Sequence, residues 1–505
     1  MNLTPLLEHG WMYAILPELI LCIGGMVLIL FDAFAPKLRG ATASLAVLVF
    51  LGAGWGERLV TPGNWFGGTY QVSAITILFD YTFLLAAILA TLFARAYLAR
   101  EGFERGEFYA MLMWGTVGMM MMAKGLDLLI VILGLELLSI CIFILVGFHR
   151  RIAVSNEASL KYFLMGAFAT GFILYGTALF YGATGSTNFA AFSKYFATAD
   201  ASNPLLTIAF VLMMSGLGFK LAVAPFHGWA PDVYQGAPSP VAGWLSVAPK
   251  AATLIALVRI FASMTPVIEQ ASWMKMVAAL SILSMVIGNA VAIAQRDLKR
   301  MLAYSGIAHV GYMLIAMLSL RDESVAAISI YVITYALMNI GAFGVVSMLA
   351  KNQNDPQTLD DIAGLGFRRP FYGLALTVCM FSLSGLPPTA GFIAKFYIFK
   401  TAVDSGHMTV ALIGILMSIV SVYYYLRVVY FLYMKEGASA VGSESHGHEA
   451  GHSYTPHATP HSPLLDTDIF GTGALIISLV GIFAIGLFPT PLFIAAGAAA
   501  RALLP

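Results

Sequence analysis

Four ionisable side chains lie deep inside long apolar stretches of the chain and could carry protons. Glu136 occurs in the run LDLLIVILGLELLSICIFILVGF, and Lys220, Lys250 and Lys395 lie inside apolar runs or beside breaks in them. A charge at the centre of a bilayer costs at least about 2.5–3.5 kcal/mol, so such residues are rarely accidental. Burial disfavours the charged form of lysine, whereas a nearby carboxylate favours it. A buried lysine whose acidic partner comes and goes can therefore load and release a proton, and Glu136 is a candidate partner.

Seven of the 27 basic residues lie within apolar stretches, and the four besides these three lysines also have simpler explanations. Lys161, near the start of its stretch, either snorkels to the membrane interface or belongs to a proton path. Snorkelling or structural pairing is favoured for Lys400 and Arg427, which lie near the ends of their stretches. Arg259 is equally consistent with a structural ion pair and with a functional role.

The composition indicates that the elements holding these charges are membrane helices. Of the 505 residues, 59% are hydrophobic and only 10% are charged, against about 25% charged in a soluble domain. The basic residues are scattered, which gives no indication of nucleic-acid binding. Cys22, Cys141 and Cys379 each lie in an apolar run without disulfide or metal-ligand spacing, so we expect them to be packing residues. The start MNLTPLLEHGW lacks Lys and Arg, which favours an uncleaved first helix.

Apolar stretches of roughly 20 residues are long enough to cross a bilayer. We expect fourteen, at residues 11–31, 41–60, 74–94, 109–123, 126–147, 158–182, 204–224, 239–262, 273–294, 299–319, 324–350, 371–403, 407–434 and 468–490. Under this count the basic residues of the loops divide 14 to 6 between the two sides, with Lys124 on the poorer side. Because cytoplasmic loops carry the excess of Lys and Arg, both termini are expected outside.

Two stretches contain helix breakers beside candidate lysines. Residues 215–244 hold Lys220 followed by four prolines, and residues 382–400 hold a Pro-Pro pair before Lys395. Proline ends or kinks a helix, and broken backbone in a membrane is tolerated where it is buried in protein or lines a hydrated cavity. Interrupted segments at matching positions in two halves indicate an inverted repeat with functional sites at the breaks.

This pattern predicts an all-α integral membrane protein with two inverted five-helix repeats. The expected parts are N-terminal helices at 1–108, the repeats at 109–263 and 273–434, a His-rich cytoplasmic loop at 435–467 and a C-terminal helix at 468–505. The histidines of the loop are His446, His448, His452, His457 and His461. Such a composition can bind metal, but with Gly, Ser and Pro throughout it favours a solvated linker.

Two histidines are candidate relays. Ser305, His309 and Tyr312 recur at i, i+4 and i+7 and share one helix face. His309 is equally consistent with proton relay and with hydrogen bonding between helices. His227, beside prolines near the membrane edge, is expected to be structural or a surface relay rather than a metal ligand. The chain has no Cys cluster, His pair at ligand spacing or dinucleotide fingerprint, so no metal or redox centre is expected on it.

Four motifs carry a family resemblance: LGLELLSI (133–140), FKLAVAPFHGWAPDVYQGAP (219–238), QRDLKRMLAYSGIAHVGY (295–312) and SLSGLPPTAGFIAKFYIF (382–399). Over residues 75–435 the chain resembles the proton-conducting, antiporter-like membrane subunits of NADH:quinone oxidoreductase, complex I. The phrases DVYQGAP and KRMLAYSGIAH look most like the subunit N branch. The sister subunits L and M, and the related subunits of sodium/proton antiporters, read differently there.

The resemblance implies a place for each candidate residue. Glu136 falls on the family's glutamate of the fifth helix, Lys220 on the lysine of the broken seventh and Lys250 on the lysine of the eighth. Lys395 falls on the terminal lysine of the broken twelfth helix, and Lys161 matches a further lysine of the sixth. In the family these groups and intervening water form a path through the middle of the membrane.

The expected function is therefore proton translocation in a bacterial inner membrane, coupled to NADH oxidation and quinone reduction. The resemblance implies that NADH, FMN, iron–sulfur clusters and quinone are bound by other subunits. It also implies that the partners are other membrane subunits, especially the antiporter-like subunit M and small membrane subunits.

Two alternatives remain open. The first is a subunit of a sodium/proton antiporter, which gene neighbours would distinguish. The second is a structural subunit that has lost conduction, which intact pumping after replacement of Lys220 and Lys395 would favour.

Overall fold

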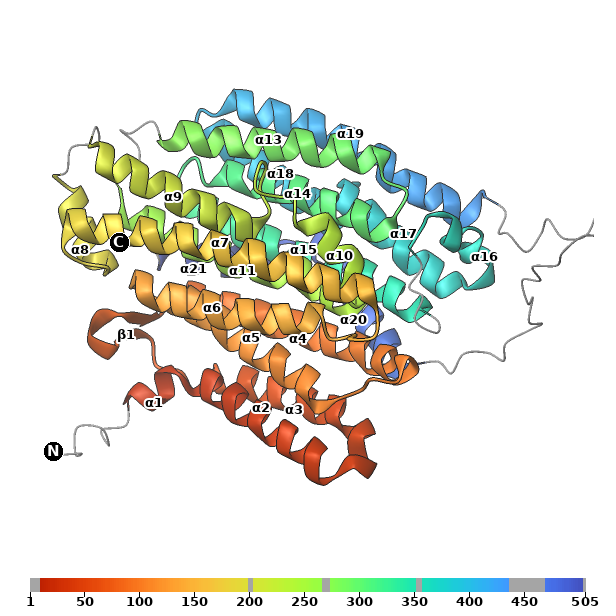
Figure 1. The fold of residues 1–505 in the computed structure, drawn as a ribbon. Coiled ribbons are helices and arrows are strands. Elements are labelled where there is room, and N and C mark those ends of the chain that lie inside the picture. The colour runs from red at the N-terminus through yellow and green to blue at the C-terminus, as the bar shows by residue number, and fades with distance from the viewer. Residues whose placement is uncertain (1–9, 199–202, 266–272, 351–356, 436–467, 503–505) are drawn as a thin grey trace, which may run out of the picture.

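The computed structural model describes residues 10–198, 203–265, 273–350, 357–435 and 468–502, and these ranges are almost entirely helical. The long helices run side by side in one general direction and form a thick slab (Figure 1). Within the described ranges, eleven helices are long and apolar enough to cross a bilayer. The expected all-α membrane architecture is therefore confirmed, whereas all but the first residue of the expected His-rich loop lies outside the described residues.

Helices and a β-hairpin form the N-terminal part of the fold. Its elements are α1 (Gly10–Ala14), α2 (Leu16–Phe34), the 3-10 helix η2 (Pro36–Ala41), α3 (Thr42–Gly56), β1 (Gly63–Trp65), η3 (Phe66–Gly68), β2 (Tyr70–Val72) and α4 (Ala74–Glu101). The strands pair antiparallel, with Trp65 opposite Tyr70. Helices α2 and α3 lie at one edge of the slab, and α4 connects them to the interior, where it packs on α11, α15 and α20 (Figure 1).

The next part contains the first broken helix. Its elements are α5 (Gly106–Lys124), α6 (Leu128–Val146), α7 (Ala153–Thr184), α8 (Phe189–Phe196), α9 (Pro204–Leu221), α10 (Ala230–Gly236) and α11 (Ser239–Ser263). The predicted break after Lys220 is confirmed, because α9 ends at Leu221 and Ala222 adopts a left-handed conformation with φ of 58°. Prolines follow at positions where a continued helix would need backbone donors, which explains why only the short α10 forms before α11.

The remaining part contains the second broken helix. Its elements are α13 (Trp273–Ala294), α14 (Leu298–Ala316), α15 (Asp322–Leu349), η4 (Asp360–Ile362), α16 (Leu365–Arg368), α17 (Pro370–Ser384), α18 (Ala390–Asp404), α19 (Met408–Tyr433), α20 (Ile469–Leu487) and α21 (Thr490–Arg501). The break before Lys395 is also confirmed. Gly385, with φ of 87°, closes α17, and the Pro-Pro pair separates it from α18.

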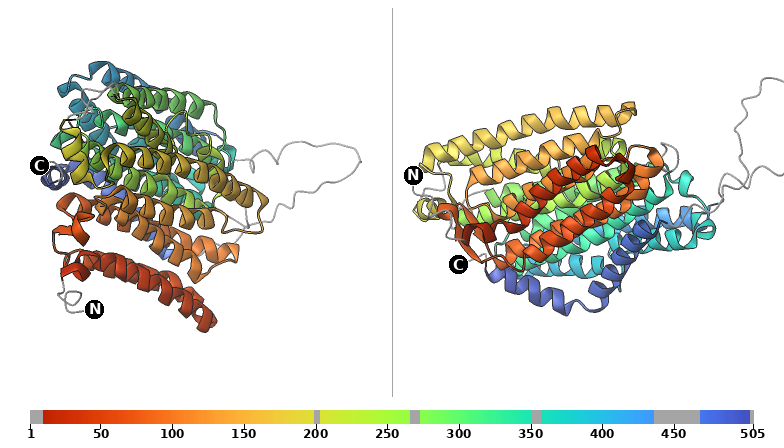
Figure 2. Two further views of the ribbon diagram at one scale, coloured as in Figure 1. Left: turned by 60° about the vertical axis from the view of Figure 1, so that its left-hand side comes forward. Right: turned by 90° about the horizontal axis from the view of Figure 1, so that it is seen from below.

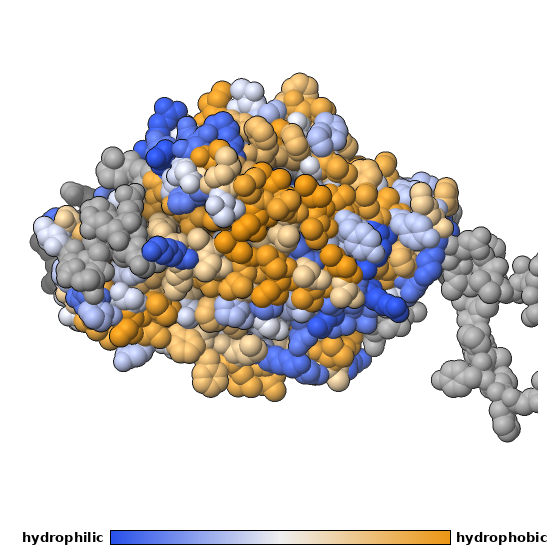
Figure 3. Space-filling model, turned by 90° about the horizontal axis from the view of Figure 1, so that it is seen from above, coloured by the Kyte–Doolittle hydropathy of each residue, from blue (hydrophilic) through white to orange (hydrophobic). Residues whose placement is uncertain are grey.

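Two helices, α11 and α15, form the centre of the slab. Almost all residues of α11 and α15 are buried, whereas fewer than half of the residues in the apolar parts of α13 and α19 are buried. The outer face over α13 and α19 shows a broad hydrophobic band with polar residues toward its ends (Figure 3). Lipid-facing helices of a membrane protein have this surface, because apolar side chains face the hydrocarbon core.

All fourteen predicted stretches overlap helices, but the number of spans stays a prediction. Helices α5 and α14 have 19 residues each and fall outside the eleven apolar spans, and the twelfth stretch is divided into α17 and α18. The inverted relation between the two repeats also stays a prediction. Helix α1, the hairpin and the end of α21 lie at the same end of the slab (Figure 2), and the side of the membrane that they face stays a prediction.

Candidate functional site

Lys220 lies at the end of α9, and its ammonium group faces α6. The buried Lys220 Nζ donates a hydrogen bond to Ser139 Oγ at 2.7 Å. Glu136, three residues earlier on the same face of α6, accepts a hydrogen bond from Thr170 Oγ1 of α7 at 2.6 Å. Lys220 and Glu136 form no direct ion pair, although the Glu136 charge acts on Lys220 at longer range. The hydroxyl groups therefore hold the base and the acid near each other but separate.

Lys250 lies in the middle of α11. Its side chain is 2% exposed, and its Nζ has no hydrogen-bond partner among the described residues. The nitrogen lies 5.7 Å from the centre of the Tyr234 ring. Gly306 of α14 leaves room at this point, since a Cβ atom there would lie 2.9 Å from both Lys250 Nζ and Tyr335 Oη. An amine and a phenol thus approach the same position on α14 without a carboxylate.

His309, one turn after Gly306 on α14, is hydrogen-bonded through both ring nitrogens. Nδ1 pairs with Tyr331 Oη of α15 at 2.8 Å, and Nε2 pairs with Tyr425 Oη of α19 at 3.0 Å. Tyr425 also bonds with Ser305. A neutral imidazole accepts at one nitrogen and donates from the other, so this ring has the geometry to pass a proton between two phenols. The expected hydrogen bonding between helices is present, and the relay stays a prediction.

Lys395 lies in α18, shortly after the second break. Its Nζ donates hydrogen bonds to the Ser384 carbonyl and to Ser418 Oγ of α19, both at 3.0 Å. The carbonyl is free to accept because α17 ends at Ser384. Lys395 Nζ also lies 5.3 Å from the centre of the Tyr312 ring, and a mostly apolar cavity of about 490 Å³ between α18 and α19 reaches this lysine. The broken helix therefore supplies the polar group that holds the lysine.

We call Glu136, Lys220, Lys250, His309 and Lys395 the central row. One face of α14 connects Lys250 to Lys395 within this row. Along that face, residue 306 approaches Lys250, residue 309 bonds with Tyr331, and residue 312 approaches Lys395. Ring contacts of Trp229 with Phe219 at 5.4 Å and with Tyr234 at 6.3 Å connect the end of α9 to the surroundings of Lys250. The row thus joins both breaks through the enclosed helices.

The structure does not bring Lys161 and His227 into the central row. Lys161 Nζ pairs with Glu157 Oε1 at 2.7 Å and Asp232 Oδ2 at 3.2 Å, and its side chain is 45% exposed. Asp232 also accepts a hydrogen bond from Arg300 Nη1 at 2.7 Å. His227 lies half-buried in the break after α9, where its ring is 6.3 Å from that of Tyr304.

The other basic residues of the apolar stretches make structural contacts. Lys400 pairs with Asp404 at 2.6 Å on the surface of α18, and Arg427 donates to the carbonyls of Ile293 and Gln295. The structural roles favoured for these two are confirmed. Arg259 donates to the Ala123 carbonyl and, at 2.7 Å, to Gln71 Oε1. It therefore binds neutral acceptors rather than an acid.

The assignment of Lys124 to a loop was wrong. Lys124 is the last residue of α5 and is completely buried, and its Nζ contacts Glu18 Oε1 at 2.8 Å, Glu57 Oε1 at 3.3 Å and Asp80 Oδ2 at 2.6 Å. We call these four residues the N-terminal cluster. A signal was present in the sequence, because Glu18 and Asp80 lie inside the predicted stretches 11–31 and 74–94.

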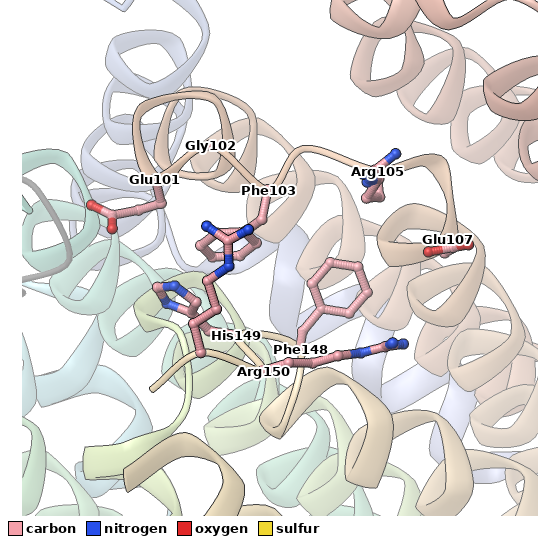
Figure 4. A pocket seen from close by; sticks show the side chains of 9 residues that line it. Glu101, Gly102, Phe103, Arg105, Glu107, Phe148, His149 and Arg150 are labelled. Atoms are coloured by element: carbon pink, nitrogen blue, oxygen red, sulfur yellow. The ribbon is translucent and has the colours of Figure 1, made fainter. Parts of the chain in front are cut away.

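A separate polar pocket of about 400 Å³ lies where the α4–α5 connection meets the segment after α6 (Figure 4). Its lining residues are Glu101, Gly102, Phe103, Arg105, Glu107, Phe148, His149, Arg150 and Arg151. The His149 and Phe103 rings lie 4.3 Å apart. The pocket contains no residue of the central row. Its three arginines are among the loop residues on which the predicted orientation is based, and the orientation stays a prediction.

The described residues contain no group of three or more His, Cys, Asp or Glu side chains arranged to hold a metal ion. Cys141 and Cys379 are buried, Cys22 is half-buried, and all three are free thiols. The binding of redox cofactors by other subunits stays a prediction.

Comparison with known proteins defines the class. Residues 125–421 match the family described as NADH:quinone oxidoreductase/Mrp antiporter, TM. Subunit N of the NADH-quinone oxidoreductase of Trichlorobacter lovleyi is 44% identical over 444 residues, covering 86% of this chain and 90% of that protein. A subunit N of Rhizobium meliloti is 35% identical over 485 residues, with 95% of each chain covered.

Solved structures give the same answer for the fold. A chain of respiratory complex I from Thermus thermophilus superposes with a TM-score of 0.77 and 33% identity, covering 96% of this chain and 100% of that chain. A chain of the Mrp complex from Dietzia sp. DQ12-45-1b gives a TM-score of 0.80 at 20% identity, covering 98% of this chain and 100% of that one, which shows a shared fold alone.

The chain therefore belongs to the family of antiporter-like membrane subunits that NADH:quinone oxidoreductases share with Mrp antiporters. Within this family it groups with subunit N, so it is a membrane subunit of NADH-quinone oxidoreductase, complex I. The resemblance found in the four sequence motifs is confirmed.

Proposed function

We propose that this subunit carries protons across the membrane through the central row, driven by electron transfer from NADH to quinone on other subunits. The observation that carries the proposal is the set of partners around Lys220, Lys250 and Lys395. These buried lysines bind hydroxyl or carbonyl oxygens, or no described group, and none of them binds a carboxylate. Because an unpaired ammonium is disfavoured in a medium of low dielectric constant, such a lysine can exchange between its charged and neutral forms.

Each member of the row has a distinct role in this proposal. Lys220 is the central carrier, and Glu136 adjusts its proton affinity across the face of α6. Lys250 connects the two halves, His309 relays between Lys250 and Lys395, and Lys395 exchanges protons with the outer face. Either direction of transfer along the row fits these contacts.

Lys161 and His227 act outside the row. Lys161 pairs with Asp232 at an exposed position, where it exchanges protons with solvent. His227, in the break after α9, is the second candidate for relay at the surface.

The same proposal gives the surroundings of the subunit. It lies in a bacterial inner membrane with both termini outside, which the 14 to 6 division of loop basic residues supports even with Lys124 removed from the smaller group. Its neighbours are other membrane subunits, especially the antiporter-like subunit M and small membrane subunits. The solved relatives belong to multisubunit assemblies, which supports this arrangement. FMN, iron–sulfur clusters and the sites for NADH and quinone are on other subunits.

The experiment is proton pumping and NADH:quinone activity in membrane vesicles that carry Lys220→Ala, with assembly checked on a native gel. Loss of both activities in a fully assembled complex supports a path that electron transfer must drive. Normal turnover with normal pumping would remove Lys220 from the mechanism and favour a structural subunit. Arg427→Gln is the matched control for losing a basic residue from a membrane helix, because among the described residues Arg427 donates its hydrogen bonds to backbone carbonyls.

A further inference from the structure

The N-terminal cluster brings ionisable side chains from four elements to one point. Glu18 comes from the first turn of α2, Glu57 directly follows α3, Asp80 lies in α4 and Lys124 ends α5. The contacting side chains are at most 8% exposed. The cluster lies outside residues 125–421, which carry the family match, and shares no residue with the central row.

The charges of this cluster do not balance. Three carboxyl groups surround one ammonium group, so full ionisation would leave a net charge of −2 in a site closed to water. Uncompensated buried charge is strongly disfavoured, so a buried carboxyl group in such a site usually binds a proton and becomes neutral. Two polar neighbours add no positive charge: Tyr70 donates a hydrogen bond from its hydroxyl to Glu18 Oε1 at 2.6 Å, and Cys22 is a thiol near Glu18. Arg259 is the nearest other cation, and it binds Gln71 and the Ala123 carbonyl rather than a carboxyl group of the cluster.

The carboxyl oxygens give an independent indication of bound protons. Glu18 Oε2, Glu57 Oε2 and Asp80 Oδ1 are buried and have no hydrogen-bond donor among the described residues. Glu57 and Asp80 both contact Lys124 Nζ, at 3.3 Å and 2.6 Å, which brings the two carboxyl groups close to each other. A hydrogen bond between two carboxyl groups requires a proton on one of them.

The cluster is attached to α11 near a surface cavity. Tyr70 is followed in β2 by Gln71, which accepts a hydrogen bond from Arg259 of α11. Arg259 and Gln71 line a cavity of about 620 Å³ at the end of the slab that carries the hairpin. Arg259 also binds the carbonyl of Ala123, next to Lys124. These contacts attach the cluster to α11 beside a cavity at the end of the slab that carries the hairpin.

We propose that Glu18, Glu57 and Asp80, held by Lys124, form a second proton-binding site that retains at least one exchangeable proton at neutral pH. Lys124 remains charged in this site, and the proton is shared within the carboxyl groups, chiefly between Glu57 and Asp80. The site exchanges protons with water through the Tyr70 and Arg259 side. This proposal does not depend on transfer through the central row.

The test is infrared spectroscopy of the assembled complex in sodium-free lipid nanodiscs at neutral pH, in H2O and D2O. The carbonyl stretch of a protonated carboxyl group shifts on deuteration. We expect this signal to decrease in Asp80→Asn and in Glu57→Gln, and to stay unchanged in Asp404→Asn, whose carboxylate is exposed. It should also be unchanged in Lys220→Ala, so that failure of the central-row proposal is distinguishable from failure of this one.

Identical protonated-carboxyl signals in the complex with and without Asp80→Asn and Glu57→Gln would overturn the proposal. If those variants do not assemble, the unsubstituted complex provides the test, with the carboxyl groups of aspartate labelled with 13C in one sample and those of glutamate in another. A proton on Asp80 gives an isotope-shifted band in the aspartate-labelled sample. Absence of a shifted band from both samples would contradict the proposal. Addition of sodium to the unsubstituted complex is the final arm. Disappearance of the signal at low millimolar sodium would show a cation site in place of the proposed proton site.

Discussion

Two regions of this molecule bury lysine and use it in different ways. In the central row, Lys220 and Lys395 bind neutral oxygens of Ser139, Ser418 and the Ser384 carbonyl, and Lys250 Nζ has no hydrogen-bond partner among the described residues. In the N-terminal cluster, Lys124 contacts three carboxyl groups at 2.6–3.3 Å. All four lysines are at most 6% exposed, so burial does not distinguish them. The number of carboxyl groups around each lysine does.

This difference determines which group can exchange a proton. A lysine without an acid gains little by staying charged in a low-dielectric interior, so it can lose its proton when its surroundings change. A lysine among several acids is held in its charged form, and the excess acids take up protons instead. Proton transfer is therefore assigned to the lysines in the central row and to the carboxyl groups in the cluster.

The largest effect is expected for Lys250→Met. This change removes the titratable group from the centre of α11 without breaking an ion pair, so assembly should be normal. Proton pumping and coupled NADH:quinone turnover should fall roughly 100-fold or more, the scale on which a positioned proton-transfer group contributes. The measurement is pumping in vesicles beside Lys275→Met, an exposed lysine at the start of α13. Unchanged pumping in Lys250→Met would contradict the proposal that Lys250 connects the two halves of the row.

Lys124→Met should instead affect stability. Removing the ammonium leaves three buried acids without a cation, and breaking such a buried pair typically costs about 3–5 kcal/mol. We expect the variant complex to lose this subunit at a lower temperature, measured by heating followed by native gel electrophoresis. The double variant Lys124→Met with Asp80→Asn should recover part of the loss. A single variant as stable as the unsubstituted complex would show that the cluster does not hold the N-terminal helices in place.

His309→Gln tests the connection along α14. Glutamine keeps hydrogen-bonding groups near Tyr331 and Tyr425 but cannot titrate, so turnover should fall roughly 100-fold, the lower end of the range for a proton-transfer group, while assembly is retained. Steady-state NADH:quinone activity per assembled complex is the measurement. Full activity would assign His309 to packing between helices alone.

The smallest effect is expected for Lys161→Ala. The lysine forms exposed ion pairs with Glu157 and Asp232, which contribute little, and solvent can replace it as a proton donor. Pumping should change less than about twofold. A loss as large as that of Lys250→Met would move Lys161 into the essential part of the path.

The burial of Lys220, Lys250 and Lys395 could be predicted from the sequence because its signals are local. An apolar run around Lys250, prolines after Lys220 and a Pro-Pro pair before Lys395 are each visible within a short window. Insertion energies make such charges conspicuous, and the structure places all three lysines in the interior.

The N-terminal cluster escaped prediction because it depends on helix boundaries and on tertiary contacts. The predicted stretch 109–123 stops one residue before Lys124, and helix ends cannot be placed to one residue by apolar patterning. Glu18 and Lys124 are 106 positions apart, and no local pattern indicates that they meet. The ion pair of Lys161 with Asp232 also depends on tertiary contacts, because the packing of α10 on α7 brings Asp232 to this lysine.

The central claim is that buried lysines with neutral partners carry the protons, and one pair of variants on α18 tests it most directly. Lys395 is buried against Ser384 and Ser418, whereas Lys400 is exposed and paired with Asp404. The measurement is the number of protons pumped per NADH oxidised in proteoliposomes containing the purified complex. The account predicts that Lys395→Met loses pumping and that Lys400→Met pumps normally. Normal pumping by an assembled Lys395→Met complex would contradict it.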